Sequence, residues 1–349
     1  MRVALVALAF HLENTKSSLF FINVLRSAFD DFHVVADGDA WYEIPRLKPD
    51  LLIVYQRLFS PEELECFGTR NVVLVPMYDA CPHTEEFWNR YRAYKVLCFS
   101  RTLHEFLEGR SFRSHHVRYF SAPPSALPAP PREKGLRIFF WERSRLIDWA
   151  CVRALLGESK VEAFHYHRSS NIESGLGELP GEQDVERYHI VFSDWFDSRA
   201  SYIEALASCT VYIAPRESEG IGLSFIEALA MGLCVVAPNA PTMNEYIEDG
   251  VNGILYDPAL PKPLSFFGAE AMGKKAADLG KKAHEAWLAA LPEMLRFFEE
   301  PLPTYRPRRH FALYLAKRGR SIVRHHYKKT RSLWTTLAGR EGPRRRRDR

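Results

Sequence analysis

The sequence predicts an α/β protein with two doubly wound halves, each built on a parallel sheet. Short apolar runs recur along the chain, as buried parallel strands do, and stretches with helical spacing separate them. A proline-rich segment divides the runs into two groups. With 349 residues and 46% hydrophobic content, the chain has the length and composition for two domains with their own cores.

In the first half, residues 1–120, the expected strands are VALVALAF, HVVAD, DLLIVYQ, NVVLVPMYD and YKVLCFS, and the clearest helical stretches are SLFFINVLRSAF and EEFWNRYRAY. Residues 121–134, SAPPSALPAPPREK, are too rich in proline for a helix or a central strand. We therefore expect them to form the linker between the domains.

In the second half, residues 135–300, the expected strands are LRIFFW, VEAFHY, HIVFSDW, VYIAP, CVVAP and GILYDP. A helical stretch, SRASYIEALASC, precedes VYIAP, and a long helix over roughly 269–298 is expected to cross back toward the first half. Residues 301–349 form a basic tail. We find no internal repeat and no G-x-G-x-x-G motif.

The segment between VYIAP and CVVAP sets two carboxylates around a glycine turn at the start of a helix. Glu219 and Glu227 are separated by seven residues, and Gly220 and Gly222 let the backbone approach a ligand closely. Ser224 begins an apolar helical run. Because a helix N-terminus carries unpaired N–H groups and a partial positive charge, this turn can hold a diphosphate.

Each glutamate also has a purely structural interpretation. Ser224 and Glu227 fit S-x-x-E, a capping box in which the glutamate closes the first helical turn. Glu219 alone could be a solvated loop charge, and the glycines ordinary turn residues.

The whole string nevertheless resembles the E-x7-E signature of retaining GT-B glycosyltransferases, in particular family 4, also called group 1. The matching positions are Glu219, Gly220, Gly222, Glu227, Ala228, Ala230 and Gly232, and the NEYIEDGVNG continuation adds Glu245, Asp249, Gly250, Asn252 and Gly253. So many matches across about forty residues are far more specific than a short motif. The resemblance implies a GT-B fold, with two Rossmann-like domains facing a cleft.

The resemblance also assigns roles to residues. It implies that Glu219 contacts hydroxyls of the transferred sugar and that Glu227 holds the ribose of a nucleotide-sugar. The diphosphate is expected at the turn, and the base beside the strand HIVFSDW. The implied donor-binding residues are Glu227, Gly220, Ile221, Gly222, Leu223, Ser224, Ser193 and Trp195.

The chain departs from the family where an arginine and a lysine usually face the diphosphate. After LRIFFW it has no glycine pair and no matching lysine, so Arg143 or Arg145 must take that role. A planar guanidinium group suits it because it can bridge two phosphate oxygens. Either residue could instead be an exposed cation at a helix start.

The first half departs further. No glycine follows the first strand until Gly38, so the family's glycine-rich loop is missing. We predict His11 and Glu13, at the carboxyl end of that strand, as acceptor-side residues. The family's His-Asp pair is replaced by Tyr78-Asp79, and we predict that His83 takes a catalytic polar role nearby; the alternative is a solvent-facing loop histidine.

Charge is unevenly distributed along the chain. Residues 306–349 contain 16 Lys/Arg and two acidic residues, whereas residues 1–305 contain 31 basic and 41 acidic residues. In the tail, apolar and aromatic side chains alternate with cations, which favours an anionic membrane surface as partner, each cation contributing about 1 kcal/mol. The alternatives are a solvated tail and, least favoured, nucleic-acid binding.

The remaining composition indicates a cytoplasmic protein, peripheral on the inner face of a membrane. The six cysteines are scattered without zinc-like spacing, which indicates buried thiols in a reducing compartment. The N-terminal apolar run is too short for a signal peptide or a membrane span. We expect no cofactor and no metal, since a helix dipole and cations can stabilise a leaving diphosphate.

The function that these observations favour is transfer of a sugar from a nucleotide-diphosphate donor to a saccharide or lipid-linked acceptor, with retention, in surface polysaccharide or lipopolysaccharide synthesis. Two alternatives remain. One is a nucleotide-sugar epimerase on the same fold, and the other is a non-catalytic protein that binds nucleotide-sugars through its second half.

Overall fold

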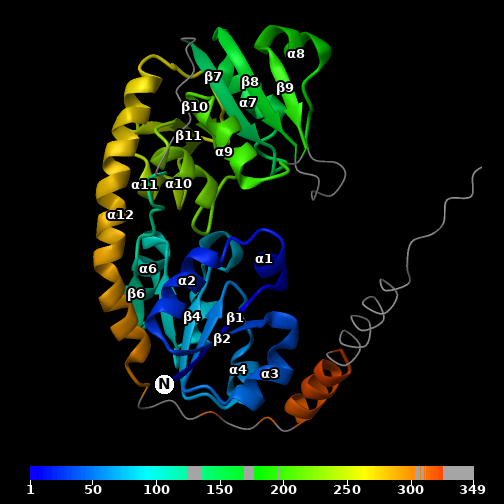
Figure 1. Ribbon diagram of the computed structural model, residues 1–349, viewed down its shortest axis with the longest axis vertical. Helices are drawn as coiled ribbons and strands as arrows, with labels where there is room; N and C mark the ends of the chain where they lie inside the picture. The colour runs from blue at the N-terminus through cyan, green and yellow to red at the C-terminus, as the bar shows by residue number, and fades with distance from the viewer. Residues whose placement is uncertain are drawn as a thin grey trace, which may run out of the picture. The chain divides into compact units, whose positions relative to one another are not determined.

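The computed structural model describes residues 1–124, 135–168, 177–194, 196–302, 307, 310 and 312–324. It confirms the predicted fold class, with two six-stranded parallel sheets and helices on their faces (Figure 1). Most of the expected linker, residues 125–134, lies outside the described residues, as do Trp195 and the tail from residue 325 onward.

The first sheet has the order β2-β1-β3-β4-β5-β6. Its strands are β1 (Arg2–Ala7), β2 (Asp31–Ala36), β3 (Leu51–Tyr55), β4 (Asn71–Val75), β5 (Lys95–Cys98) and β6 (Ser114–His116). The first five were expected from their apolar runs, whereas the short, half-buried β6 was not. The order reverses at β1 and β3, which is where ligands bind in open α/β sheets.

The helices of the first half are α1 (Ala9–Glu13), α2 (Leu19–Ala28), α3 (Ala40–Leu47), α4 (Pro61–Phe67), α5 (Glu85–Asn89) and α6 (Arg101–Glu108), with short 3-10 turns η1 (Asp37–Asp39) and η2 (Tyr78–Ala80). The expected first strand extended to Phe10, but it ends at Ala7 and α1 follows. Helix α4 was missed although its signal is in the sequence: Ser60 and Glu63 form a capping box and Pro61 opens the helix.

The second sheet has the order β12-β11-β10-β7-β8-β9. Its strands are β7 (Leu136–Trp141), β8 (Val161–His167), β9 (Ile190–Ser193), β10 (Val211–Ile213), β11 (Cys234–Pro238) and β12 (Gly253–Tyr256), and its helices are α7 (Trp149–Leu156), α8 (Glu182–Tyr188), α9 (Arg199–Ala207), α10 (Leu223–Ala230), α11 (Met243–Tyr246) and α12 (Ala269–Glu299). All six strands had been expected from the sequence.

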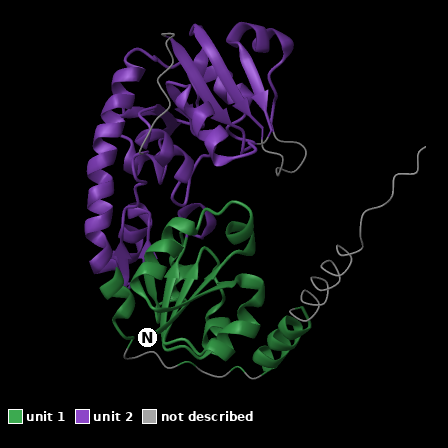
Figure 2. Cartoon of the chain, in the orientation of Figure 1, with its two compact units in different colours: residues 1–76, 83–96, 295–349 green, residues 77–82, 97–294 purple. Residues whose placement is uncertain are grey.

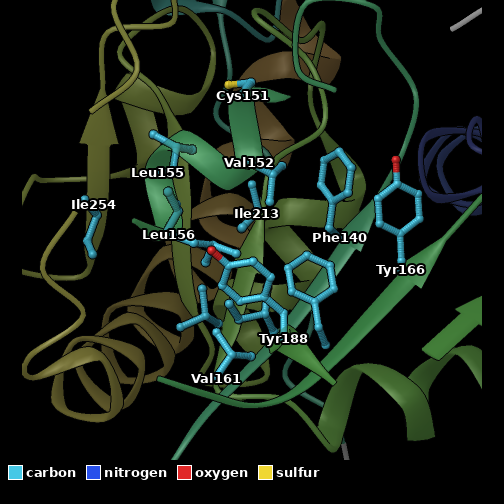
Figure 3. Packing of buried hydrophobic residues seen from close by; sticks show 14 of the residues in the cluster. Phe140, Cys151, Val152, Leu155, Leu156, Val161, Tyr166, Tyr188, Ile213 and Ile254 are labelled. Atoms are coloured by element: carbon cyan, nitrogen blue, oxygen red, sulfur yellow. The ribbon is translucent and has the colours of Figure 1, made fainter. Parts of the chain in front are cut away.

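A buried apolar cluster fills one face of the second sheet. Phe140 of β7 lies in it together with Val152, Leu155 and Leu156 of α7 (Figure 3). Ile138, two residues before Phe140 on β7, belongs to the same cluster. The intervening Phe139 faces the other side and stacks on His165 and Tyr212. Because Phe139 and Tyr212 have no solvent exposure, this face is covered as well, as is usual for parallel sheets.

The chain separates into two compact units (Figure 2). Unit 1 contains residues 1–76, 83–96 and 295–349, and unit 2 contains residues 77–82 and 97–294. The strands of the two sheets lie within 2–116 and 136–256, inside the expected domains 1–120 and 135–300. The unit boundaries, by contrast, pass through β5 and through α12.

The end of α12 is fixed within unit 1 by a buried lysine. Lys95 on β5 has no solvent exposure, and its Nζ donates to the carbonyl oxygens of Phe297, Phe298 and Glu300 at 2.6, 2.9 and 2.6 Å. Asn71 of β4 also donates to the Phe298 carbonyl, at 2.8 Å. A cation at the C-terminus of a helix satisfies carbonyls that lack partners within the helix.

Residues 312–324 form a further helix in unit 1. Within the described parts of the chain, no helix combines the length and the apolarity that crossing a bilayer requires. All six cysteines are free, and five of them are buried, as expected, while Cys66 is half-buried.

Replacing Lys95 by methionine should lower the free energy of unfolding by about 2–3 kcal/mol, because carbonyls at the end of α12 lose their charged donor. Urea titration would measure this. The matched control is Lys160→Met, whose side chain is 86% exposed; it should change stability by less than about 0.5 kcal/mol. Equal effects of the two substitutions would contradict the role of Lys95.

Candidate active site

The candidate site lies where the strand order of the second sheet reverses. Strands β7 and β10 are neighbours, with Phe139 opposite Tyr212 and Phe140 opposite Ile213. Because parallel strands end at the same edge, the loops 142–148 and 214–222 that follow them leave the sheet side by side. This pairing joins two segments that lie far apart in the chain.

The loop after β10 requires glycine at two positions. Gly222 has φ +75° and is the N-cap of α10, and a Cβ on it would lie 1.9 Å from the ring of Phe225. A Cβ on Gly220 would lie 2.6 Å from Cβ of Met77 and 2.9 Å from Asp79 Oδ1. The loop backbone is therefore packed too closely for any side chain there.

The capping-box interpretation of Glu227 is wrong. Helix α10 begins at Leu223, not at Ser224, and its N-cap makes no side-chain hydrogen bond. Ser224 instead accepts a hydrogen bond from the Tyr212 hydroxyl at 2.9 Å, and Glu227 accepts one from Arg199 at 2.6 Å. The first N–H groups of α10 thus have no capping side chain among the described residues, as an anion site at a helix start requires.

Glu219 is half-buried beside a second carboxylate. Burial raises the pKa of Glu219 to about 7; the charges of Arg216 and Arg143 oppose that rise, and Asp79 adds to it. Arg216 also forms an ion pair with Asp79, with 3.1 Å between Nη1 and Oδ2. Two carboxyl groups and two guanidinium groups therefore act on one another at the point where the strand order reverses.

The two predicted arginines differ in their surroundings. Arg143 is half-buried, its guanidinium lies 4.9 Å from the centre of the Trp141 ring, and its charge favours ionisation of both Asp79 and Glu219. Arg145 is exposed and is not among the described charges that shift either carboxyl. The structure thus brings Arg143, and not Arg145, to the glutamate.

The segment 188–266, which contains the loop 214–222 and α10, matches the sequence model of the family Glycosyl transferases group 1. The similarity to this family thus covers a part of the second half of the chain. It is also 27% identical over 112 residues to an uncharacterized glycosyltransferase, MJ1178, of Methanocaldococcus jannaschii. That match covers 30% of this chain and 31% of the relative, so it concerns about a third of each protein.

Solved structures with the same fold extend over most of the chain. Anabaena Alr3699/HepE in complex with UDP and glucose matches with a TM-score of 0.60 at 12% identity, over 85% of this chain and 99% of that one. Sucrose-phosphate synthase of Thermosynechococcus elongatus gives 0.58 at 12% identity over 85% and 98%. The lipopolysaccharide outer core galactosyltransferase WaaB gives 0.50 at 13% identity over 93% and 100%. These likenesses show that the fold is GT-B.

Within the matched segment 188–266, the second part of the motif builds a turn. The buried Asn252 side chain accepts from the Glu248 N–H at 2.7 Å and donates to the Tyr246 carbonyl at 3.0 Å. Asp249 accepts from the Leu255 N–H at 2.8 Å. Glu245 accepts from the hydroxyl of Ser100 and from backbone N–H groups at the start of α6. These motif residues therefore have structural partners.

Ser193, which was expected beside the base, is the last residue of β9 and lies among histidine and phenylalanine rings. Its hydroxyl lies 2.7 Å from Nε2 of His165 and 2.7 Å from Nδ1 of His167, and the ring of Phe196 stacks on His167 at 4.5 Å. Burial lowers the pKa of both histidines, that of His167 to about 4. The neighbouring Trp195, also predicted, lies outside the described residues.

The acceptor-side candidates belong to unit 1. His11 and Glu13 lie in α1, directly after β1, and His11 Nδ1 is 2.9 Å from Thr15 Oγ1, while Glu13 is exposed. His83 is an exposed residue of the loop before α5. Their chemical roles stay predictions.

Sequence analysis assigned no role to four residues of the site, although it noted Asp79 at the position of the family's His-Asp pair. Arg216 and Asp79 bear charge next to Glu219, and His165 and His167 contact Ser193. Arg216 had a usable signal, because it follows β10 directly and precedes Glu219 by three residues. Asp79 follows β4 of the first sheet and the histidines lie on β8, so only the tertiary structure brings them near the predicted residues.

The expectation of a metal-free site did not take into account a pair of aspartates, Asp37 and Asp39, that are separated only by Gly38. Two carboxylates with this spacing are candidate metal ligands. Asp37 accepts a hydrogen bond from the Ala9 N–H at 3.1 Å, at the start of α1. In the described ranges, no group of three or more His, Cys, Asp or Glu side chains is placed to hold a metal ion.

Replacing Glu219 by glutamine should change how stability depends on pH. Because the pKa is raised from 4.5 to about 7 on folding, the folded protein holds an extra proton between these values. Wild-type stability should therefore fall as pH rises through this window, by up to about 3 kcal/mol. Glu219→Gln should remove that component, so the variant gains stability relative to wild type at pH 8 but not at pH 4.5.

Thermal unfolding at several pH values would measure the effect. Glu217→Gln, which changes an exposed carboxylate in the same loop, is the matched control. If the melting temperature of Glu219→Gln depends on pH in the same way as that of the wild type, the fold does not disfavour the ionised form of Glu219.

Proposed function

We propose that this protein is a glycosyltransferase that moves a sugar from a nucleotide-diphosphate donor to an acceptor. The observation that carries the proposal is the convergence of Arg143 with Glu219 and Arg216 at the uncapped start of α10. Glu219, Arg216 and α10 lie in the segment 188–266, which matches the group 1 family model. The structurally similar HepE binds UDP and glucose in its complex, which supports a donor of this class.

In this proposal the diphosphate lies against the N–H groups of the turn 220–224. Negative charge grows on the diphosphate as its bond to the sugar breaks, and prearranged N–H groups and cations stabilise that charge. Arg143 and Arg216 supply two guanidinium groups, so the proposal requires no metal and no cofactor. Arg216 thereby replaces the lysine that the sequence lacks.

Glu219 is assigned to hydroxyls of the transferred sugar and Glu227 to the ribose of the donor. Glu227 lies on α10 four residues into the helix, and its ion pair with the 72% exposed Arg199 can exchange for a ribose hydroxyl at little cost. We further propose retention at the anomeric carbon and a hexose as the transferred group, both carried over from the family resemblance.

The acceptor is proposed to be a saccharide or a lipid-linked saccharide in surface polysaccharide or lipopolysaccharide synthesis. The structural likeness to WaaB supports this class. His11 and Glu13 are the proposed acceptor-side residues, and His83 a polar group for the reacting centre. We place the protein in the cytoplasm, peripheral on the inner face of a membrane, because its tail is basic.

The test is incubation with a panel of nucleotide-sugars, with and without saccharide acceptors. Release of nucleoside diphosphate that increases with acceptor supports the proposal. Conversion of one nucleotide-sugar into another without acceptor would identify an epimerase. Tight binding in a thermal-shift assay of the same panel, with no turnover of any donor, would favour the non-catalytic alternative.

Arg143→Ala should weaken binding of a nucleoside diphosphate by about 1.5–3 kcal/mol, the range for a hydrogen bond to a charged group. Arg145→Ala provides the matched control, because it removes the same charge from the same loop, and its affinity should stay within about twofold of wild type. Calorimetric titration would compare them. Normal binding by Arg143→Ala would mean that the phosphate site is built without this residue.

Glu219→Gln should lower turnover by about 10²-fold while nucleotide binding is kept, because its contact strengthens where charge develops in the transition state. Glu227→Gln should instead raise the KM for the donor. Steady-state kinetics on the donor and acceptor found in the panel would measure both, with Glu217→Gln as the control. Wild-type turnover by Glu219→Gln would overturn the assignment of the pair.

A further inference from the structure

The helix formed by residues 312–324, hereafter the basic helix, lies against the rest of unit 1 along one side. Lys317 Nζ lies 2.9 Å from Glu63 Oε1, and Ser321 is only 6% exposed. Just before the helix, His310 Nε2 lies 2.6 Å from Glu65 Oε2. These contacts give the helix a defined inner side.

Its outer side is apolar and open to solvent. Leu315 is 53% exposed and Val323 is 70% exposed. The exposed small residues Ala312, Ala316 and Gly319 share that side, since each of the five positions lies three or four residues from another of them. We call these five residues the apolar stripe. Exposed aliphatic side chains aligned on one helix indicate a surface that another apolar phase covers.

The charged residues of the basic helix itself all have one sign. The basic helix contains Lys317, Arg318, Arg320 and Arg324 and no acidic residue, and both Arg320 and Arg324 are exposed. The chain continues from residue 325 to 349 with nine Lys/Arg and two acidic residues, and with Leu333, Trp334 and Leu337 among them. Residues 1–305, by contrast, contain ten more acidic than basic residues.

We propose that the apolar stripe of the basic helix inserts into the surface of an anionic lipid bilayer, with Arg320 and Arg324 at the level of the headgroups. A bilayer surface offers negative charge and an apolar layer together, which matches cations next to Leu315 and Val323. Nucleic acid binds cations through its phosphates but gives exposed aliphatic side chains no partner. The acidic remainder of the chain is repelled from such a surface, so the basic helix sets which side faces the membrane.

This inference specifies the contact surface for the membrane partner proposed above, and its test involves neither donor nor sugar transfer. Full-length protein is sedimented with vesicles of phosphatidylcholine containing 30% phosphatidylglycerol and with vesicles of phosphatidylcholine alone. Binding should be at least tenfold stronger to the anionic vesicles and should weaken with salt. A double-stranded oligonucleotide is titrated in parallel.

Two pairs of variants separate insertion from charge attraction. Leu315→Ser/Val323→Ser should weaken binding to anionic vesicles about tenfold, whereas Leu288→Ser/Val191→Ser, at 50% and 63% exposed positions elsewhere, should leave it unchanged. Arg320→Gln/Arg324→Gln should weaken binding more than Lys274→Gln/Lys275→Gln, which removes two exposed charges from α12. Melting temperatures confirm that each variant is folded.

The proposal is overturned if the protein binds both kinds of vesicle equally, or if Leu315→Ser/Val323→Ser binds anionic vesicles like wild type. It is also overturned if the oligonucleotide binds the protein more tightly than the anionic vesicles do and displaces the protein from them. Sugar transfer in the donor panel together with any of these results would leave the proposed function standing. Vesicle binding as expected, without transfer of any sugar, would support the membrane contact and contradict the proposed function.

Discussion

The pairing of β7 with β10 is the constraint on which the candidate site depends. These strands are neighbours in the sheet although β8 and β9 lie between them in the chain, so the loops that follow them meet at one edge. One loop contributes Arg143, and the other contributes Arg216, Glu219 and the start of α10. A different strand order with the same sequence elements would separate Arg143 from Arg216 and Glu219.

The electrostatics of the site follow from partial burial of two carboxyl groups. Burial and the charge of Asp79 disfavour ionisation of Glu219, while Arg216 and Arg143 favour it, and the pKa near 7 is the balance. A buried carboxylate without cations would be costly, and two cations without carboxylates would repel each other. The ion pair of Arg216 with Asp79 holds the guanidinium within reach of the turn and leaves it 37% exposed.

The E-x7-E motif combines chemical and structural requirements in one short segment. Gly222 gives α10 a tight, uncapped start, and Gly232, at φ +84°, ends it in a left-handed turn in which Leu233 N–H bonds to the Ala228 carbonyl. Small residues are also needed for packing: a Cβ on Gly273 of α12 would lie 2.1 Å from the Gly232 carbonyl oxygen. The residues around Glu219 and Glu227 therefore fix the backbone, and any role of the two glutamates must be compatible with that conformation.

The sequence by itself determined the fold class, eleven of the twelve strands, the helix over 269–298 and the turn at 219–224. These follow from local patterns: apolar runs make buried strands, and glycines allow the backbone to bend at defined positions. It could not separate Arg143 from Arg145, since both follow the same strand and only packing against Trp141 distinguishes them. It likewise left the capping box of Glu227 open, which the contacts of Ser224 and Arg199 excluded. Asp79, His165 and His167 entered the site only through the tertiary structure. Asp79 follows a strand of the first sheet and the histidines lie on β8, so their nearness to Glu219 and Ser193 depends on packing and strand order and not on distance along the chain.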